Sequence, residues 1–301
     1  MLRMGKSGAR REVIKIAFQG ERGAYSEAAA IAHYGLDIQT LPCETFADVF
    51  QAVVEGISDR GFIPIENSLA GSIHKNFDLL LRHNLYIVAE HYHRINHCLM
   101  ALPGVNMEQL REVYSHPQAL AQCDSFISAM KNVRSIASTD TAGSARWIKE
   151  QGMRSAAAIA SRRAAEVYGM EILAEGIEDD PANFTRFLAL ASKPEGSEEE
   201  SKTSIVITLQ HRPGALHQAL GIFATRGIDL TKIESRPLVG RPWEYLFYLD
   251  FIGALNHADI KAAISELEDF CSSMRVLGSY ARHNWILEIE EQEIEPGTTR
   301  D

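Results

Sequence analysis

The feature that most constrains the fold of this chain is a regular alternation of short apolar runs with amphipathic segments. Ile14–Phe18 and Gly61–Ile65 have the length and composition of buried strands, and helical periodicity follows each of them. The alternation continues to about residue 192, with one long helix expected over Ala119–Met130. Repeated strand and helix units predict a mostly parallel, doubly wound α/β sheet, and a segment of this length favours two lobes.

The sequence changes character near Ser192. Residues 193–202 are rich in Gly, Ser and Glu, which is typical of a linker. Residues 203–283 then follow the order strand, helix, strand, strand, helix, strand, which predicts a ferredoxin-like βαββαβ domain. Two helices would cover one face of its sheet, and the other face or an edge would be free to pair. Residues 284–301 form an acidic tail.

Composition narrows the classes of function. The net charge of −10 comes without any basic run, so we expect no nucleic-acid partner. The basic residues 1–11 precede an apolar run too short for a secretion signal, and no apolar span of 18 residues exists. We therefore expect a cytoplasmic protein with no membrane partner. The cysteines lack a CxxC pair, which indicates free thiols. They are Cys43, Cys98, Cys123 and Cys271.

Five polar segments follow predicted strands. In a doubly wound fold such turns lie on the same side of the sheet, where ligands bind. Each segment alone is equally typical of an ordinary helix cap or, for the last one, of a strand entering the core. Their shared position favours one polar site. The segments are Gly20–Ser26, Pro64–Ile73, Ser115–Gln118 with Gln122, Ser138–Gly143 and Asn183–Phe187.

Thr185 is the candidate for the chemistry of this site. Flanked by Arg186 and screened from water by Phe184 and Phe187, its hydroxyl can donate a directed hydrogen bond to a polar leaving group. Arg186 could clamp a carboxylate bidentately, or it could turn away and brace the strand. The sequence leaves both orientations open.

Several histidines raise the question of a metal site. No carboxylate accompanies them at ligand spacing, so we expect no metal. We interpret His93 and His97 as polar residues at a crossover between lobes. The histidines considered are His91, His93, His97 and His116.

Taken in order, these segments resemble the prephenate dehydratases, and Gly214–His217 followed by Glu234–Pro237 resembles the regulatory ACT domain of that family. The resemblance implies a two-lobed, periplasmic-binding-protein-like (type II) catalytic domain over residues 14–192, with crossovers near residues 91 and 177. It also implies an ACT domain over residues 203–283. Bifunctional members carry an N-terminal chorismate mutase, and the dozen or so residues before the first strand imply the monofunctional bacterial form.

The activity implied by the resemblance is the conversion of prephenate to phenylpyruvate in L-phenylalanine biosynthesis, with no cofactor. Loss of hydroxide and carbon dioxide makes the ring aromatic, so the enzyme has to help the hydroxyl leave. Thr185 would donate to that hydroxyl, while Asn67, Ser115 and Gln122 would position the ring and the donor. The substrate-binding residues implied are Ser68, Gly71, Ser72, Thr139, Thr141, Ala142, Arg186 and Phe187.

The ACT resemblance implies feedback inhibition by L-phenylalanine. Gly214 permits close backbone approach, and exposed amides there can bind a carboxylate. His217 stands where the family often has an apolar residue. The domains would pair about a two-fold axis. This predicts a homo-oligomer that is at least a dimer, and we expect a tetramer. The effector-binding residues implied are Gly214, Ala215, Leu216, His217, Asp229, Leu230, Glu234, Ser235, Arg236 and Pro237.

Two other functions stay open. The first is arogenate dehydratase, whose substrate carries an amine in place of the keto group. The second is a non-catalytic solute-binding or sensor protein with the same two lobes, against which the presence of Thr185 and the lack of a secretion signal both count.

Overall fold

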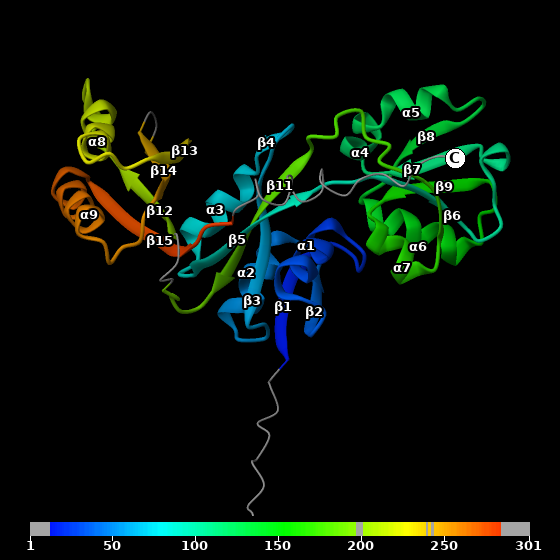
Figure 1. Cartoon of the computed structure of the whole chain (residues 1–301), viewed down its shortest axis with the longest axis horizontal. Coiled ribbons are helices and arrows are strands. Elements are labelled where there is room, and N and C mark those ends of the chain that lie inside the picture. Colours follow the sequence, from blue (N-terminus) through cyan, green and yellow to red (C-terminus); the bar gives the residue numbers. More distant parts are fainter. Residues whose placement is uncertain (1–12, 197–200, 239, 242–243, 284–301) are drawn as a thin grey trace, which may run out of the picture.

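The computed structural model describes residues 13–196, 201–238, 240–241 and 244–283. It consists of a central lobe, a second lobe on one side and a third domain on the other (Figure 1). The first lobe contains β1 (Ile14–Gln19), α1 (Tyr25–Tyr34), β2 (Ile38–Cys43), α2 (Phe46–Val54), β3 (Arg60–Asn67), β4 (Gly71–Ser72), α3 (His74–Arg82), β5 (Tyr86–Arg94) and β11 (Phe184–Ala191).

The second lobe is formed by the chain between β5 and β11. It contains β6 (Cys98–Ala101), the 3-10 helix η1 (Met107–Gln109), β7 (Glu112–Ser115), α4 (Pro117–Gln122), α5 (Asp124–Ala129), β8 (Arg134–Ala137), α6 (Thr141–Gln151), β9 (Ala156–Ala160), α7 (Arg162–Tyr168) and β10 (Glu171–Glu175). The chain therefore enters this lobe after Arg94 and leaves it before Phe184.

The two lobes share one sheet topology. The strand order is β2-β1-β3-β11-β5 in the first lobe and β8-β7-β9-β6-β10 in the second. In each, the strand that arrives from the other lobe lies between the third and the last strand and runs antiparallel to both. The predicted two-lobed, periplasmic-binding-protein-like fold is confirmed. The sheets are mixed rather than mostly parallel, because each lobe receives a strand in the opposite direction.

Two local differences from the sequence prediction have clear causes. The pattern did not indicate β2, because Gln39, Thr40 and Pro42 leave this segment without an apolar run. It is an edge strand, where proline costs no ladder hydrogen bond. The helix expected over Ala119–Met130 is broken at Cys123. There the carbonyl of Gln122 accepts a hydrogen bond from the amide of Asp179, at 2.7 Å, in the segment that returns to the first lobe.

The third domain contains β12 (Ser201–Thr208), α8 (Ala215–Ala224), β13 (Leu230–Pro237), β14 (Tyr245–Ile252), α9 (Ala258–Phe270) and β15 (Ser273–Ala281). Its antiparallel sheet has the order β13-β14-β12-β15, and both helices pack on one face. The predicted βαββαβ domain is confirmed.

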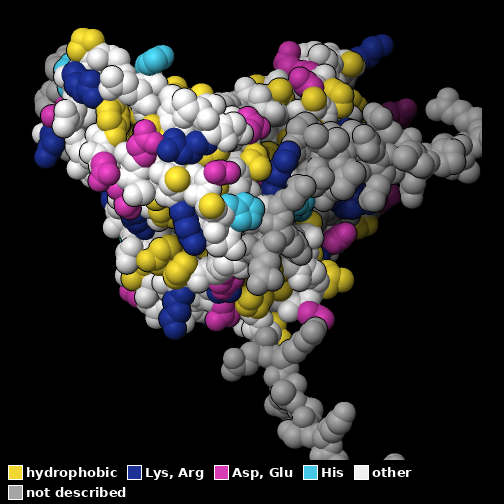
Figure 2. Space-filling view, turned by 60° about the vertical axis from the view of Figure 1, so that its left-hand side comes forward, with side chains coloured by type: hydrophobic (Ala, Val, Ile, Leu, Met, Phe, Trp, Pro, Cys, Tyr) yellow, Lys and Arg dark blue, Asp and Glu magenta, His cyan; other side chains and the backbone are white. Residues whose placement is uncertain are grey.

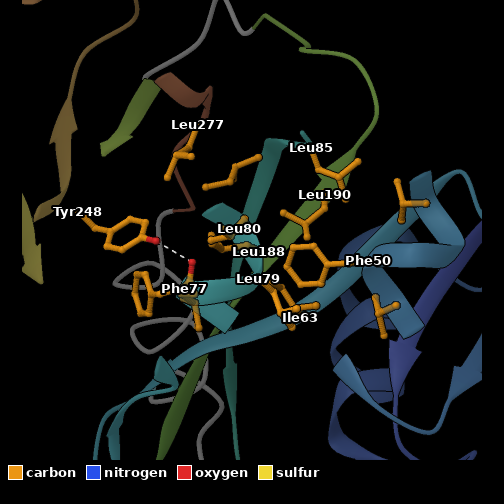
Figure 3. Close-up of a cluster of buried hydrophobic side chains, with 14 of the residues drawn as sticks. Phe50, Ile63, Phe77, Leu79, Leu80, Leu85, Leu188, Leu190, Tyr248 and Leu277 are labelled. Atoms are coloured by element: carbon orange, nitrogen blue, oxygen red, sulfur yellow. Dashed lines mark hydrogen bonds between the residues drawn. The ribbon is translucent and has the colours of Figure 1, made fainter. Parts of the chain in front are cut away.

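The other face of this sheet is covered by the first lobe. Tyr248 and Leu277 share a core with Phe77, Leu80 and other first-lobe side chains, as Figure 3 shows. The Tyr248 hydroxyl donates to the Phe77 carbonyl at 2.6 Å. The face that the sequence left free to pair is thus occupied within the chain, and the edge strand β13 remains as the open side of the sheet.

Charge is distributed without a dominant patch on the face where the third domain meets the first lobe. Acidic and basic side chains are interspersed there (Figure 2). In the described part of the chain, no helix has the length and apolar character needed to cross a membrane.

The third domain and the first lobe approach each other closely at Gly278. A Cβ atom on this residue would lie far inside van der Waals distance of the Ile87 carbonyl oxygen in β5. We predict that Gly278→Ala lowers the free energy of unfolding by about 1–3 kcal/mol, because backbone has to move to admit the methyl group. Denaturant unfolding of the whole chain measures this.

Gly221→Ala is the matched control for Gly278→Ala. Gly221 lies inside α8, where an added Cβ meets nothing within 4 Å. This variant should be as stable as the wild type or about 0.5–1 kcal/mol more stable. Equal losses in both variants would show that Gly278 does not set the fit between the two domains.

Candidate active site

A cavity of about 440 Å³ lies between the two lobes, where β3 and β11 of the first lobe face α4 and the start of α6 in the second. Six of the predicted catalytic and substrate-binding residues line it, and they come from both lobes. They are Asn67, Gln122, Thr139, Thr141, Thr185 and Phe187.

Asn67 fixes the direction of the Thr185 hydroxyl. The Asn67 Oδ1 atom accepts hydrogen bonds from the amides of Leu69 and Ala70, at 3.1 and 2.9 Å, so its amide nitrogen faces the other way. That nitrogen donates to Thr185 Oγ1 at 3.0 Å and to Asn183 Oδ1 at 2.8 Å. Because Thr185 Oγ1 accepts from Asn67, its own hydrogen is left for an acceptor in the cleft.

A second chain of polar groups crosses the cavity wall. The Tyr25 hydroxyl is 2.7 Å from His97 Nδ1, and His97 Nε2 is 3.0 Å from Gln122 Oε1. Burial lowers the pKa of His97 and raises that of Tyr25 well above its usual value. The imidazole is therefore neutral near pH 7, with one donor and one acceptor nitrogen, and the tyrosine keeps its hydrogen.

Sequence reasoning missed Tyr25 and His97 as site residues. Tyr25 stands in the segment Gly20–Ser26 that the sequence singled out, but the sequence assigned it no role of its own. His97 was placed at a lobe crossover, which is where it lies, and its side chain points into the cavity from there. The signal that would have found it is its position one residue before β6.

Other predicted residues support the cavity without lining it. Ser115 is fully buried and donates to the Ile159 carbonyl at 2.6 Å. Ser68 donates to the Ala182 carbonyl at 2.8 Å and accepts from the Phe184 amide at 2.9 Å, so it ties β3 to the return segment. Ala142 and Gly71 are likewise absent from the cavity wall.

The prediction that Arg186 contacts substrate is corrected by its position. Neighbouring residues of a strand point to opposite faces, and Arg186 points away from the cleft. Its guanidinium pairs with Glu90 at 2.8 Å and with Asp250 at 2.5 Å, and it donates to the Tyr280 hydroxyl at 3.1 Å. Lys202 also pairs with Glu90, at 2.7 Å. Arg186 turns away from the cleft, which is the alternative that the sequence had left open, and its partners connect β11 to the third domain.

Charge stabilisation within this buried cluster is mutual. Burial alone would lower the pKa of Arg186, but Asp250 and Glu90 raise it well above its usual value. Burial would raise the pKa of Asp250, but Arg186 and the Ser204 hydroxyl hold it below its usual value. Each ion is thus kept charged by its partners, and removal of one would leave the others uncompensated.

Ser72 is also corrected. The hairpin of β3 and β4 turns toward the third domain, and the Ser72 hydroxyl donates to Glu234 at 2.6 Å. Beside it, Lys232 of β13 pairs with Glu66 of β3 at 2.9 Å. The residues predicted for substrate and for effector therefore meet at this hairpin.

The predicted effector residues lie in two places. Gly214, Leu216 and His217 surround the start of α8, which has no side-chain cap. Along β13, Glu234 and Arg236 face the first lobe, where Arg236 pairs with Asp78 at 3.0 Å. Of the remaining effector residues, Ala215 is buried. The others are exposed or partly exposed, and they are Asp229, Leu230, Ser235 and Pro237.

The other histidines are not members of the chain Tyr25–His97–Gln122, although His116 lines the same cavity. His116 caps α4 by accepting from the Gln118 amide at 3.2 Å. His91 and His93 line a second cavity, of about 980 Å³, together with residues of α1 and α7, and burial lowers their pKa values to about 3 and about 4. Across the described residues, no group of three or more His, Cys, Asp or Glu side chains is arranged to hold a metal ion.

The protein has two lobes with a hydroxyl donor in the cleft between them, and a ferredoxin-like domain packs on the first lobe. These features indicate a two-lobed enzyme. Comparison with known proteins narrows the class. The family model for prephenate dehydratase matches residues 16–195, and the model for the ACT domain matches residues 203–271. The chain belongs to the prephenate dehydratase family and carries an ACT domain. It is a dehydratase, that is, a carbon–oxygen lyase.

Individual relatives are similar over most of the chain. A protein of Arabidopsis thaliana named arogenate dehydratase/prephenate dehydratase 2, chloroplastic, is 49% identical over 278 residues, 89% of this chain and 72% of that protein. The structure of GqqA, described as a novel type of quorum quenching acylase, has a TM-score of 0.83 and 36% identity over 90% of this chain and 99% of that one. Prephenate dehydratase from Arthrobacter aurescens, solved in complex with L-Phe, has a TM-score of 0.82 and 29% identity over 92% and 100%.

The predicted cytoplasmic location is wrong on this comparison. The Arabidopsis relative is named chloroplastic, and so are two more that are 48% and 47% identical to this chain.

The buried ion cluster leads to a prediction about stability. Arg186→Met should lower the free energy of unfolding by about 3–5 kcal/mol, because Glu90 and Asp250 would remain buried without their partner. Denaturant unfolding measures the loss. Arg226→Met is the control: Arg226 pairs with the half-exposed Glu266 at 2.6 Å, and its loss should cost less than about 1 kcal/mol. A similar small loss for Arg186 would mean that the cluster does not hold the two domains together.

Proposed function

We propose that this protein converts prephenate to phenylpyruvate with loss of carbon dioxide and hydroxide. The observation that carries the proposal is the Thr185 hydroxyl, which accepts from Asn67 at 3.0 Å and so directs its own hydrogen into the cleft between the lobes. A donor aimed at the leaving oxygen stabilises the charge that develops there as the carbon–oxygen bond breaks.

The reaction needs little else from the protein. The bond between the ring carbon and the carboxylate carbon breaks, and its electron pair moves into the ring as carbon dioxide and hydroxide leave. The gain of aromaticity supplies the driving force. The cleft has to hold the substrate so that its ring hydroxyl meets Thr185, which is the role we propose for Gln122, Thr139 and Thr141 on the opposite lobe.

Arogenate is the second candidate substrate. It differs from prephenate by an ammonium group in place of the keto oxygen, and its dehydration gives phenylalanine directly. The naming of the Arabidopsis relative for both activities supports it as well as it supports prephenate.

Assay of the purified protein with each substrate tests the proposal. We expect formation of phenylpyruvate from prephenate, phenylalanine from arogenate, or both. Turnover of neither substrate would overturn the proposal and favour the solute-binding or sensor function.

Replacement of Thr185 tests the role of its hydroxyl. Thr185→Ala should lower kcat by about 100-fold or more with a smaller change in KM, because a leaving-group donor acts mainly in the transition state. Thr185→Ser should keep part of the activity, since it retains the hydroxyl. Steady-state kinetics of both variants measures this, and a wild-type kcat in the alanine variant would remove Thr185 from the mechanism.

We propose further that L-phenylalanine inhibits this enzyme by binding to its ACT domain, between Gly214–His217 and β13 of a second chain in a homodimer or homotetramer. The L-Phe complex of the Arthrobacter aurescens enzyme supports a small-molecule effector. The uncapped start of α8 offers amides for its carboxylate, and the open edge of β13 offers a surface for the second chain.

Two glycines of α8 give a matched test of this site. Gly214 and Gly227 flank the helix, have φ angles of 80° and 63°, and have open space where a Cβ would go. Alanine should be strained at both positions, because both φ angles are positive. We predict that Gly214→Ala raises the phenylalanine concentration for half inhibition by about tenfold or more and that Gly227→Ala leaves it near the wild-type value. Equal effects of the two variants would place the effector elsewhere.

A further inference from the structure

The chain Tyr25–His97–Gln122 has two complete hydrogen-bonding states. In the first, His97 Nε2 donates to Gln122 Oε1 across 3.0 Å, and the Tyr25 hydroxyl donates to Nδ1 across 2.7 Å. In the second, the Gln122 amide is turned by half a rotation, its nitrogen donates to Nε2, and Nδ1 donates to Tyr25. The tyrosine then donates to the Asn96 carbonyl, 3.1 Å away.

Both states satisfy every member of the chain, but they present opposite groups to the cleft. A carboxamide has its donor on one side and its acceptor on the other. When Gln122 Oε1 accepts from His97, the two N–H groups of the amide point into the cleft. When the amide nitrogen donates to His97, the carbonyl oxygen of Gln122 points into the cleft.

In the orientation proposed above, the part of the substrate in which prephenate and arogenate differ would lie at Gln122. This residue lies on α4 of the second lobe, opposite Thr185 on β11 of the first. The ring hydroxyl and the side chain are on opposite carbons of the substrate ring. If Thr185 meets the hydroxyl, the side chain points to the second lobe. A keto oxygen there needs a donor, and an ammonium group needs an acceptor.

We propose that Gln122 is a specificity-determining residue that serves both substrates, with His97 and Tyr25 as positioning residues that change tautomer and hydrogen direction to suit each one. The proposal rests on the dehydratase function proposed above. Change between states takes one proton from water onto one ring nitrogen and returns one from the other, so no net charge enters the site. Both His97 and Gln122 line the water-accessible cavity.

Gln122→Glu fixes the kind of group that this chain presents to the cleft. A carboxylate can only accept, so it fixes the proton of His97 on Nε2 and presents an acceptor to the cleft. We expect kcat/KM for arogenate relative to prephenate to rise by about tenfold or more, the effect of one charge-assisted hydrogen bond gained or lost. In ¹⁵N spectra of the variant, the His97 ring should show a protonated Nε2 and an unprotonated Nδ1.

Gln118→Glu is the matched control. Gln118 lines the same cavity from the same helix, and within the described residues no hydrogen bond joins its side chain to His97. It brings the same charge into the cleft without entering the chain. An equal rise in the ratio would mean that charge alone selects arogenate, and it would overturn the proposal.

Other outcomes test the inference and the proposed function separately. If the wild type acts on both substrates and the ratio does not move in Gln122→Glu, the inference fails and the proposed function stands. If the wild type consumes one substrate only, the adaptable chain is wrong while the dehydratase function stands. If it consumes neither, both fail. A His97 ring protonated on Nδ1 in Gln122→Glu would also overturn the role of the chain.

Discussion

The pairing of Arg186 with Glu90 and Asp250 is the interaction on which the rest of this structure depends. Four charged side chains are buried together here, those of Glu90, Arg186, Lys202 and Asp250, and each is tolerated only because the others are present. Glu90 belongs to β5, Arg186 to β11 and Asp250 to β14, so the cluster fixes the two strands that lead to the second lobe against the sheet of the ACT domain.

Strand β11, which carries Arg186, also carries the hydroxyl of the active site. Thr185 and Arg186 are neighbours, and the alternation of side chains in β11 sends one into the cleft and the other into the ion cluster. A shift of the ACT sheet against β11 therefore acts on the residue next to Thr185. The β3–β4 hairpin forms a second such connection, because Asn67 in β3 holds Thr185 while Ser72 in β4 contacts Glu234.

The sequence predicted the order of the domains and the residue types of the cleft, because both depend on local patterns. Strand alternation and turn residues depend on near neighbours in the chain. The orientation of Arg186 could not be predicted, since its partners Glu90 and Asp250 lie 96 and 64 residues away. His97 shows the same limit: its role comes from contact with Tyr25, 72 residues away, and Gln122, 25 residues away.

The break of the predicted helix at Cys123 also depends on a contact between residues far apart in the sequence. Periodicity gave one helix over Ala119–Met130, and only the amide of Asp179 in the returning segment shows why the helix ends at Gln122. This hydrogen bond also fixes the backbone of the residue whose side chain meets His97. The local exception to helix propensity therefore lies at the site, where irregular backbone places a functional side chain.

The position of β11 in the chain has a consequence for the order in which the protein can assemble. The second lobe is one continuous stretch, whereas the first lobe lacks a strand between β3 and β5 until residue 191 has been synthesised. A ribosome would release a complete second lobe while the first still had a gap in the middle of its sheet. The strand that fills the gap brings Thr185 with it, so closure of the sheet and arrival of the reactive hydroxyl are a single event.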